Sequence, residues 1–239
     1  MENQYLDYDL VRPVSQEDEI TRAEFIKKTY QHLGIAILGF LIVETLFLSI
    51  PAMRALGLRM TQGWTWLLVL GGFMFVTNLA DNWALNATDR KKQYMALGLY
   101  VVAEAFIFIP IITIALYVGE GFSILNKAGI LTVALFAGIS AVAFMTKKDY
   151  SFLRNVLTVG GILAIGLIVA GMLFGFDLGL WFSVAMVGLA AVSILYQTSN
   201  VINHYNKDQY VAASLGLFAS FMLLLWYIIS ILIRIAGRD

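Results

Sequence analysis

Two glutamates, Glu44 and Glu104, lie within long apolar stretches that contain neither lysine nor arginine. A carboxyl group is costly to place in hydrocarbon, so it faces protein or a water-filled space and marks a candidate functional site. Glu104 falls about ten residues into its stretch, which corresponds to a depth of ~15 Å in a helix. Carboxyl groups at such positions are typical of pathways for cations or protons.

Each acid also has a purely structural interpretation. Glu104 either supplies a carboxylate to an interior cavity or is a protonated group that only hydrogen-bonds to a neighbouring helix. Glu44 lies nearer the other end of its stretch, where it either joins a functional site or forms a structural ion pair with Arg54 or Arg59. The residues alone leave these alternatives open.

The elements that position these acids follow from composition. Of 239 residues, 60% are hydrophobic and only 13% are charged, whereas soluble domains contain about 25% charged residues. A helix needs ~20 apolar residues to cross a bilayer core of ~30 Å, and only helices satisfy their own backbone in lipid. The sequence therefore predicts an all-α polytopic membrane protein, a bundle of seven transmembrane helices. The predicted spans are about 30–50, 64–83, 94–118, 122–145, 152–175, 178–200 and 211–235.

Several function classes find no support in the composition. Basic and acidic residues balance at 16 each, which argues against a nucleic-acid partner. The chain has no cysteine and only two histidines, so we expect neither a metal site nor a cofactor. Zinc-protease, serine-hydrolase and phosphate-loop motifs are missing from the sequence, and we therefore do not expect an enzyme.

The chain divides into a polar tail, residues 1–29, and a seven-helix transmembrane domain, residues 30–239. Within the tail, Ser15 and Asp18 resemble the capping box of a short amphipathic helix at 16–29. Eleven of the 16 Lys and Arg residues fall in the tail and in the loops on its side of the membrane. By the positive-inside rule the N-terminus is cytoplasmic and the C-terminus lies on the opposite side.

Two segments carry a family resemblance. One is the run Phe144-Met-Thr-Lys-Lys-Asp-Tyr-Ser-Phe-Leu153, and the other is Tyr196-Gln-Thr-Ser-Asn-Val-Ile-Asn203, followed by Asp208-Gln-Tyr-Val-Ala-Ala-Ser-Leu215. With seven spans, these segments resemble the Bax inhibitor 1 family. The run Thr198-Ser-Asn-Val-Ile202 and the final Arg238-Asp239 resemble its bacterial branch, which implies an inner-membrane protein.

The resemblance implies a function in membrane protein quality control and stress response. It suggests that the chain binds and modulates the membrane-anchored ATP-dependent protease, with the tail as a handle, and that its other partner is the lipid bilayer. Lys147, Lys148 and Asp149 either contact that partner or lipid headgroups, or they set orientation while Asp149 caps the fifth span.

The resemblance also suggests an alternative function, a pH-sensitive calcium or proton leak channel. Family members that leak calcium carry two aspartates at the positions that match Gln197 and Ser220 here. Neither side chain can titrate, although the two can hydrogen-bond between helices. We expect Glu104 to face Gln197 and Ser220 in the bundle interior, with the C-terminal helix central.

Overall fold

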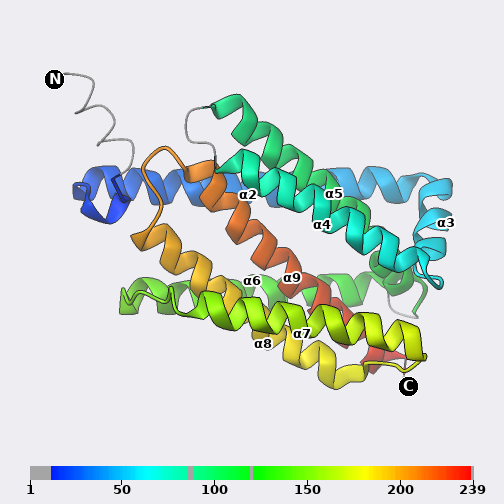
Figure 1. Ribbon diagram of the computed structural model, residues 1–239. Coiled ribbons are helices and arrows are strands. Elements are labelled where there is room, and N and C mark those ends of the chain that lie inside the picture. Colours follow the sequence, from blue (N-terminus) through cyan, green and yellow to red (C-terminus); the bar gives the residue numbers. More distant parts are fainter. Residues whose placement is uncertain (1–11, 86–88, 119–120, 238–239) are drawn as a thin grey trace.

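The computed structural model describes residues 12–85, 89–118 and 121–237, which form eight α-helices and one short 3-10 helix (Figure 1). In chain order these are η1 (Val14–Gln16), α2 (Glu19–Ser49), α3 (Pro51–Met60), α4 (Thr65–Ala84), α5 (Arg90–Tyr117), α6 (Gly121–Thr146), α7 (Leu153–Phe174), α8 (Gly179–Asn203) and α9 (Tyr210–Ala236).

Seven of these helices are long and apolar enough to cross a membrane, namely α2 and α4 to α9. This confirms the predicted all-α bundle. Consecutive long helices alternate in direction, so α2, α5, α7 and α9 begin at the end of the bundle where the chain begins. We call this end the N-terminal end, and the opposite end, near Ala236, the C-terminal end (Figure 1).

Helix α2 begins after Asp18, whereas the sequence predicted a cap at Ser15. The N-cap is Asp18, whose Oδ1 accepts hydrogen bonds from the backbone N–H of Ile20 at 2.9 Å and of Thr21 at 3.0 Å. These bonds hold the pKa of Asp18 below its usual range. The capping box from Ser15 was therefore wrong, since Asp18 itself caps the helix. Residues 19–29 form the first turns of one continuous helix, α2.

Helix α3 was not foreseen, because residues 51–63 read as a connection. Pro51 occupies its first turn, where a missing N–H leaves no bond unmade. Gly57 lies against α5 so closely that an added Cβ would be 2.5 Å from Cγ2 of Ile109 and 3.2 Å from the backbone nitrogen of Pro110. A glycine thus lets α3 pack against the middle of α5.

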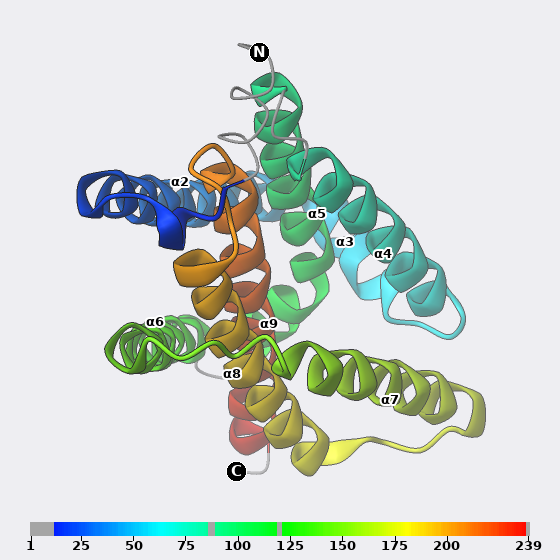
Figure 2. The same cartoon turned by 60° about the vertical axis from the view of Figure 1, so that its left-hand side comes forward.

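Two helices form the interior of the bundle. Of the most apolar 18-residue stretch of each span, 67% is buried in α5 and 50% in α9. In the other spans the buried share of that stretch is 11% to 28%. Helix α9 packs against α2, α4, α5, α6 and α8, and Figure 2 shows it in the middle of the bundle. The predicted central position of the C-terminal helix is confirmed, whereas the burial of α5 was not predicted.

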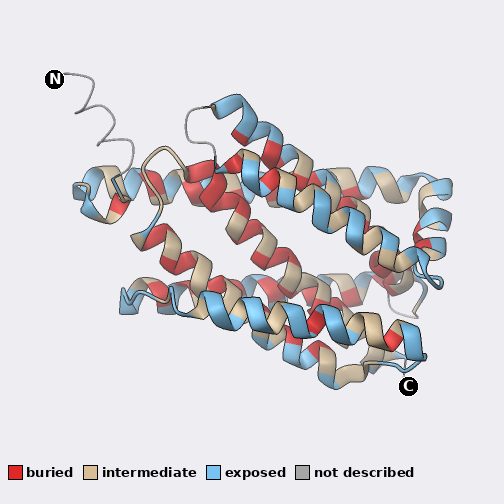
Figure 3. Cartoon of the chain, viewed as in Figure 1, coloured by how far each residue is buried: buried red, intermediate tan, exposed pale blue. Residues whose placement is uncertain are grey.

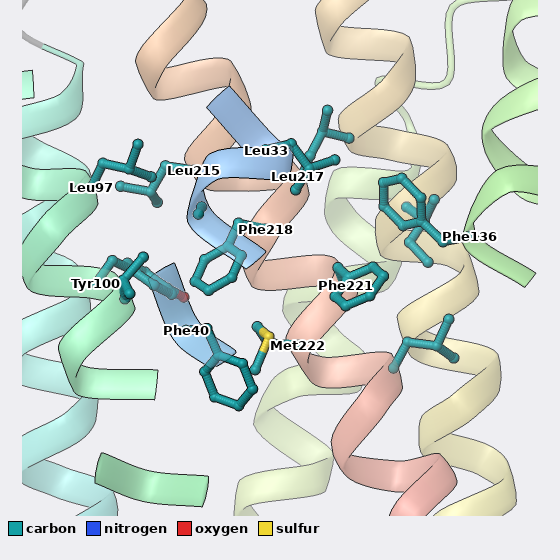
Figure 4. Packing of buried hydrophobic residues seen from close by; sticks show 14 of the residues in the cluster. Leu33, Phe40, Leu97, Tyr100, Phe136, Leu215, Leu217, Phe218, Phe221 and Met222 are labelled. Atoms are coloured by element: carbon teal, nitrogen blue, oxygen red, sulfur yellow. The ribbon is translucent and has the colours of Figure 1, made fainter. Parts of the chain in front are cut away.

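The core lies where α9 meets α2, α5 and α6 (Figure 4). Phe218 of α9 is fully buried, and its ring meets that of Tyr100 edge-on with centroids 6.1 Å apart. On the other face of α9, Phe221 meets Phe136 of α6 in the same way at 5.5 Å. Interlocking aromatic rings therefore fix α9 between α5 and α6.

Helices α4 and α7 lie at the periphery. Only 11% of the most apolar 18-residue stretch of each is buried, and in Figure 3 nearly all of their residues are exposed or intermediate. Exposed apolar side chains on these helices, such as Phe75 and Ile162, suit contact with lipid. Helix α4 packs mainly against α5, and α7 mainly against α8, so the two pairs leave a space between them.

Candidate functional site

A cavity of about 860 Å³ lies in that space. Side chains of α4 and α5 line one side, those of α7 and α8 the other, and α9 forms its floor; Figure 2 shows these helices in this arrangement. The volume is within the ~300–1,000 Å³ typical of ligand pockets. The cavity runs from Asp177 and Arg234 at the C-terminal end to Tyr100, Glu104 and Gln197 near the middle of the bundle.

Three predicted site residues, Glu104, Gln197 and Ser220, line the inner part of this cavity. Glu104 is only 5% exposed, and within the described residues its carboxyl group makes no hydrogen bond or ion pair. Oε1 of Gln197 is likewise buried without a hydrogen-bond partner. Two buried acceptors therefore share one cavity, and neither is satisfied by the protein.

Ser220 bonds to a residue that the sequence analysis missed. Its hydroxyl donates to the carbonyl oxygen of Gly216 at 3.0 Å, and its oxygen lies 2.8 Å from Oγ of Ser193 on α8. Because the Ser220 proton is used, Ser193 donates the second bond. Within the described residues Gln197 and Ser220 form no hydrogen bond, and the partner of Ser220 on α8 is Ser193, one helical turn before Gln197. Ser193 lies four residues before Gln197, so helical spacing places both on one face of α8, and this could have indicated Ser193 as a site residue.

Gly216 explains the position of Gln197. A Cβ on Gly216 would lie 2.7 Å from Oε1 and 2.9 Å from Cδ of Gln197, so the amide packs directly on the glycine backbone. Gly216 is one turn before Ser220 on the same face of α9. The close approach of α8 and α9 at this glycine therefore holds the Gln197 side chain at the inner end of the cavity.

Aromatic rings form much of the cavity wall. Trp66 of α4 stacks on Trp226 of α9 with centroids 5.9 Å apart and an interplanar angle of 18°. Phe108 of α5 meets Trp226 edge-on at 5.1 Å. The ring of Trp226 therefore lines the cavity between the two walls.

An ion pair lies at the C-terminal end of the cavity. Arg234 donates two hydrogen bonds to Asp177, at 2.7 and 2.9 Å, in the bidentate geometry that suits guanidinium and carboxylate. This contact holds the pKa of Asp177 below its usual range. Asp177 belongs to the turn between α7 and α8, so the pair ties that turn to the last turns of α9.

Glu44 lies outside the cavity. It is 4% exposed, and both carboxyl oxygens are buried without a hydrogen-bond partner. The structural ion pair with Arg54 or Arg59 is therefore not formed among the described residues. The reason is geometric: Glu44 faces inward from α2, whereas α3, which carries both arginines, leaves their side chains off this buried face.

Asp81 is an acid that the sequence analysis missed, although it falls within the predicted span 64–83. It lies near the end of α4, in the turn before Leu85. Burial and the neighbouring Tyr196 and Asp81 raise the pKa of Tyr205, so Asp81 lies close to the α8–α9 connection. Its position three residues from the end of α4 was the available signal.

At the N-terminal end the two segments that carried the family resemblance meet. Ser199 of α8 is fully buried, and its Oγ accepts a hydrogen bond from the backbone N–H of Tyr150 at 2.9 Å and donates to the carbonyl oxygen of Lys148 at 3.3 Å. The α6–α7 connection is thereby fixed against α8. The side chains of Lys147 and Lys148 remain exposed beside it.

Asp149 does not cap the fifth span, contrary to expectation. Helix α7 begins at Leu153, and Asp149 instead accepts a hydrogen bond from the backbone N–H of Ser151 at 2.9 Å. Its Oδ1 also lies 3.1 Å from Nε2 of His204, to which the sequence analysis assigned no role. The His204 contact holds the pKa of Asp149 below its usual range.

The start of the described chain joins the same end. The backbone N–H of Val14 donates to the carbonyl oxygen of Tyr205 at 2.8 Å, and Oγ of Ser15 donates to that of Asn203 at 3.0 Å. Val14 is buried beneath these bonds. Residues 12–16 are therefore fixed to the α8–α9 connection, and residues 1–11 lie outside the described part of the chain.

Comparison with known proteins places these features in context. The sequence model of a family described as "Inhibitor of apoptosis-promoting Bax1" matches residues 22–237. An uncharacterized protein of Pseudomonas aeruginosa is 27% identical over 237 residues, covering 97% of each chain. Bax inhibitor 1 of Schizosaccharomyces pombe is 25% identical over 95% of this chain and 82% of its own. The "Modulator of FtsH protease YccA" of Escherichia coli is 31% identical over 135 residues, 56% of this chain and 60% of its own.

Proposed function

The chain belongs to the Bax inhibitor 1 family of membrane proteins, and from that premise we propose that it modulates the membrane-anchored ATP-dependent protease FtsH in a bacterial inner membrane. The partner comes from the printed name of the Escherichia coli relative. In this proposal the N-terminal end faces the cytoplasm, in keeping with the excess of basic residues there.

The observation that carries the proposal is the assembly at the N-terminal end. Ser199 joins the α6–α7 connection to α8, and Val14 and Ser15 fix the N-terminal segment beside it. Exposed Lys147 and Lys148 lie next to this assembly. A fixed anchor with exposed basic side chains and a polar segment preceding it provides a surface on which a cytoplasmic partner can dock.

The test is co-purification of the full chain with the protease from membranes. Deletion of residues 1–11 or the double substitution Lys147→Glu and Lys148→Glu should reduce the recovered protease, because the first removes the polar segment that precedes the anchor in sequence and the second reverses two exposed charges beside it. The matched control is Lys127→Glu, at the start of α6 near the C-terminal end, which should leave recovery unchanged. Equal recovery by all variants would contradict the proposal.

A second function, a cation or proton leak, is favoured by one observation. The cavity reaches from the C-terminal end to Glu104 near the middle of the bundle, so a carboxyl group lies at the end of a partial pathway. Gln197 and Ser220 weaken this reading, since neither can titrate. Purified protein in liposomes tests it: calcium or proton flux that Glu104→Gln abolishes would favour the leak, and absence of flux at every pH would exclude it.

A further inference from the structure

At the inner end of the cavity, two acceptors receive no hydrogen bond from the described residues. The Glu104 carboxyl group and Oε1 of Gln197 both accept, and neither has a donor among the described residues. The nearby serine protons are already used, since Ser220 donates to Gly216 and Ser193 donates to Ser220. Buried acceptors are normally satisfied, so this pair calls for an occupant that brings donors.

The site also lacks a positive charge. Arg234 is the one basic residue among the described residues that line the cavity, and it is paired with Asp177. It lies 14 residues after Ser220 on α9, a distance of ~21 Å along the helix. A carboxylate buried in an apolar site is strongly unfavourable unless it is paired. The missing donor is therefore best supplied as a cation.

Most of the remaining cavity lining is apolar or aromatic. The walls between its two ends include Trp66, Phe108, Ile111, Leu223 and Trp226. Ring faces attract cations within ~6 Å, and apolar walls favour a hydrocarbon chain. The cavity thus offers an unpaired carboxyl group at its inner end and a long apolar body, in a helix bundle whose peripheral helices face lipid.

We propose that this cavity binds lipophilic amines, with the ammonium group at Glu104 and Gln197 and the hydrocarbon chain extending toward the Asp177–Arg234 pair. An ammonium group has three N–H donors, enough for both acceptors. A fatty acid would bring a like charge to Glu104. A fatty alcohol has one donor and no charge, so it would leave one acceptor unpaired. This inference is independent of the proposed protease partner.

Thermal unfolding of the purified full chain in detergent tests the proposal with three probes of one chain length: dodecylamine, 1-dodecanol and dodecanoate. A ligand that binds the folded state raises Tm, and at one ligand concentration the increase grows with the logarithm of its affinity. Dodecylamine should raise the Tm of the wild type more than the other two probes. Glu104→Gln keeps the shape of the side chain and should weaken amine binding about tenfold or more, the loss expected for one charge-assisted hydrogen bond.

The matched control for charge is Glu44→Gln, which removes an equally buried carboxyl group outside the cavity and should leave the preference for the amine intact. Binding of the amine by Glu104→Gln with the affinity of the wild type would overturn the proposal. So would a wild type that binds the alcohol as well as the amine.

A second pair of variants tests the location. Ile168 lines the cavity from α7, whereas its neighbour Leu167 is 46% exposed and does not line it. Ile168→Trp should fill part of the cavity and abolish the Tm increase from dodecylamine, while Leu167→Trp should preserve it. An equal Tm increase in both variants would place the amine elsewhere and overturn the proposal.

Discussion

Glu44 and Glu104 are buried to nearly the same degree, at 4% and 5% exposure, yet their surroundings differ. The region around Glu44 is sealed: both its oxygens are enclosed and lack partners. The region around Glu104 opens on a cavity of about 860 Å³. Burial alone therefore does not distinguish a functional acid from a structural one. The space beside the carboxyl group does, because only that space can admit a ligand or water.

One side chain separates the two regions. Phe108 follows Glu104 by one turn of α5, and its ring meets that of Phe40, one turn before Glu44 on α2, with centroids 5.2 Å apart. The same Phe108 ring meets that of Trp226 in the cavity wall, with centroids 5.1 Å apart. The difference between the sealed and open regions depends on this partition, so the largest effect is expected there.

Phe108→Ala should remove the partition and lower the free energy of unfolding by about 3 kcal/mol, the lower end of the range for buried phenylalanine. The lower end applies because lipid tails are as apolar as the lost ring contacts, which leaves mainly the cavity contribution. Denaturant or thermal unfolding in detergent measures it. A change below ~1 kcal/mol would show that the neighbouring helices close the gap.

Glu44→Met should raise the free energy of unfolding by about 1–3 kcal/mol, because it removes two unsatisfied acceptors from a sealed site. The matched change Glu104→Met should give a smaller gain, since the cavity lets solvent or a ligand reach the carboxyl group. Unfolding of the two variants in one detergent compares them directly. A destabilised Glu44→Met would mean that the carboxyl group has a partner outside the described residues.

The open and sealed regions also differ in what the sequence could predict. The number of spans follows from apolar length, and the central C-terminal helix follows from the small residues in its first half, such as Ser214 and Gly216. Glu104 and Ser220 could be grouped from their similar depth, whereas Gln197 and Ser220 were paired by the resemblance to the family. All three residues line the cavity.

Other features depend on contacts that one sequence does not encode locally. Ser193, and not Gln197, bonds to Ser220, because the Gln197 amide packs on the backbone of Gly216, where the missing side chain leaves room for it. Asp149 bonds to His204 rather than to α7, since a turn at Tyr150 intervenes before the helix begins. These pairings join residues far apart in the chain, so periodicity and helix-capping rules could not predict them.

Gly57→Ala and Gly216→Ala compare close packing at the contact between α3 and α5 with close packing beside the cavity. A Cβ on Gly57 would meet Ile109 at 2.5 Å and the Pro110 backbone at 3.2 Å where α3 packs on α5, and backbone cannot move aside. We expect a loss of about 1–3 kcal/mol for this overpacking.

At Gly216 the obstructing group is the end of the Gln197 side chain, which can rotate into the cavity. The expected loss for Gly216→Ala is therefore under ~1 kcal/mol. Unfolding in detergent measures both variants. A larger loss for Gly216→Ala than for Gly57→Ala would show that the cavity end is packed at least as tightly as the contact between α3 and α5.

The smallest effect is expected at the mouth of the open region, where Asp177 pairs with Arg234. Both side chains are partly exposed, at 68% and 37%, so solvent screening limits the coupling to under ~1 kcal/mol. The pKa of Asp177 is lowered in the folded protein. Its contribution is thus fully present above the ordinary aspartate pKa of about 4 and is lost as the pH falls through the lowered value.

A double-mutant cycle of Asp177→Asn and Arg234→Gln isolates this coupling. Stability measured at neutral pH should show a small favourable coupling energy, and the difference between the wild type and Asp177→Asn should vanish in acid. A coupling that persists below the folded pKa would contradict the sign of the shift. Because so weak an ion pair is easily opened, the mouth of the cavity can admit an occupant with little loss of stability, whereas the sealed region around Glu44 cannot open without separating α2 from α5.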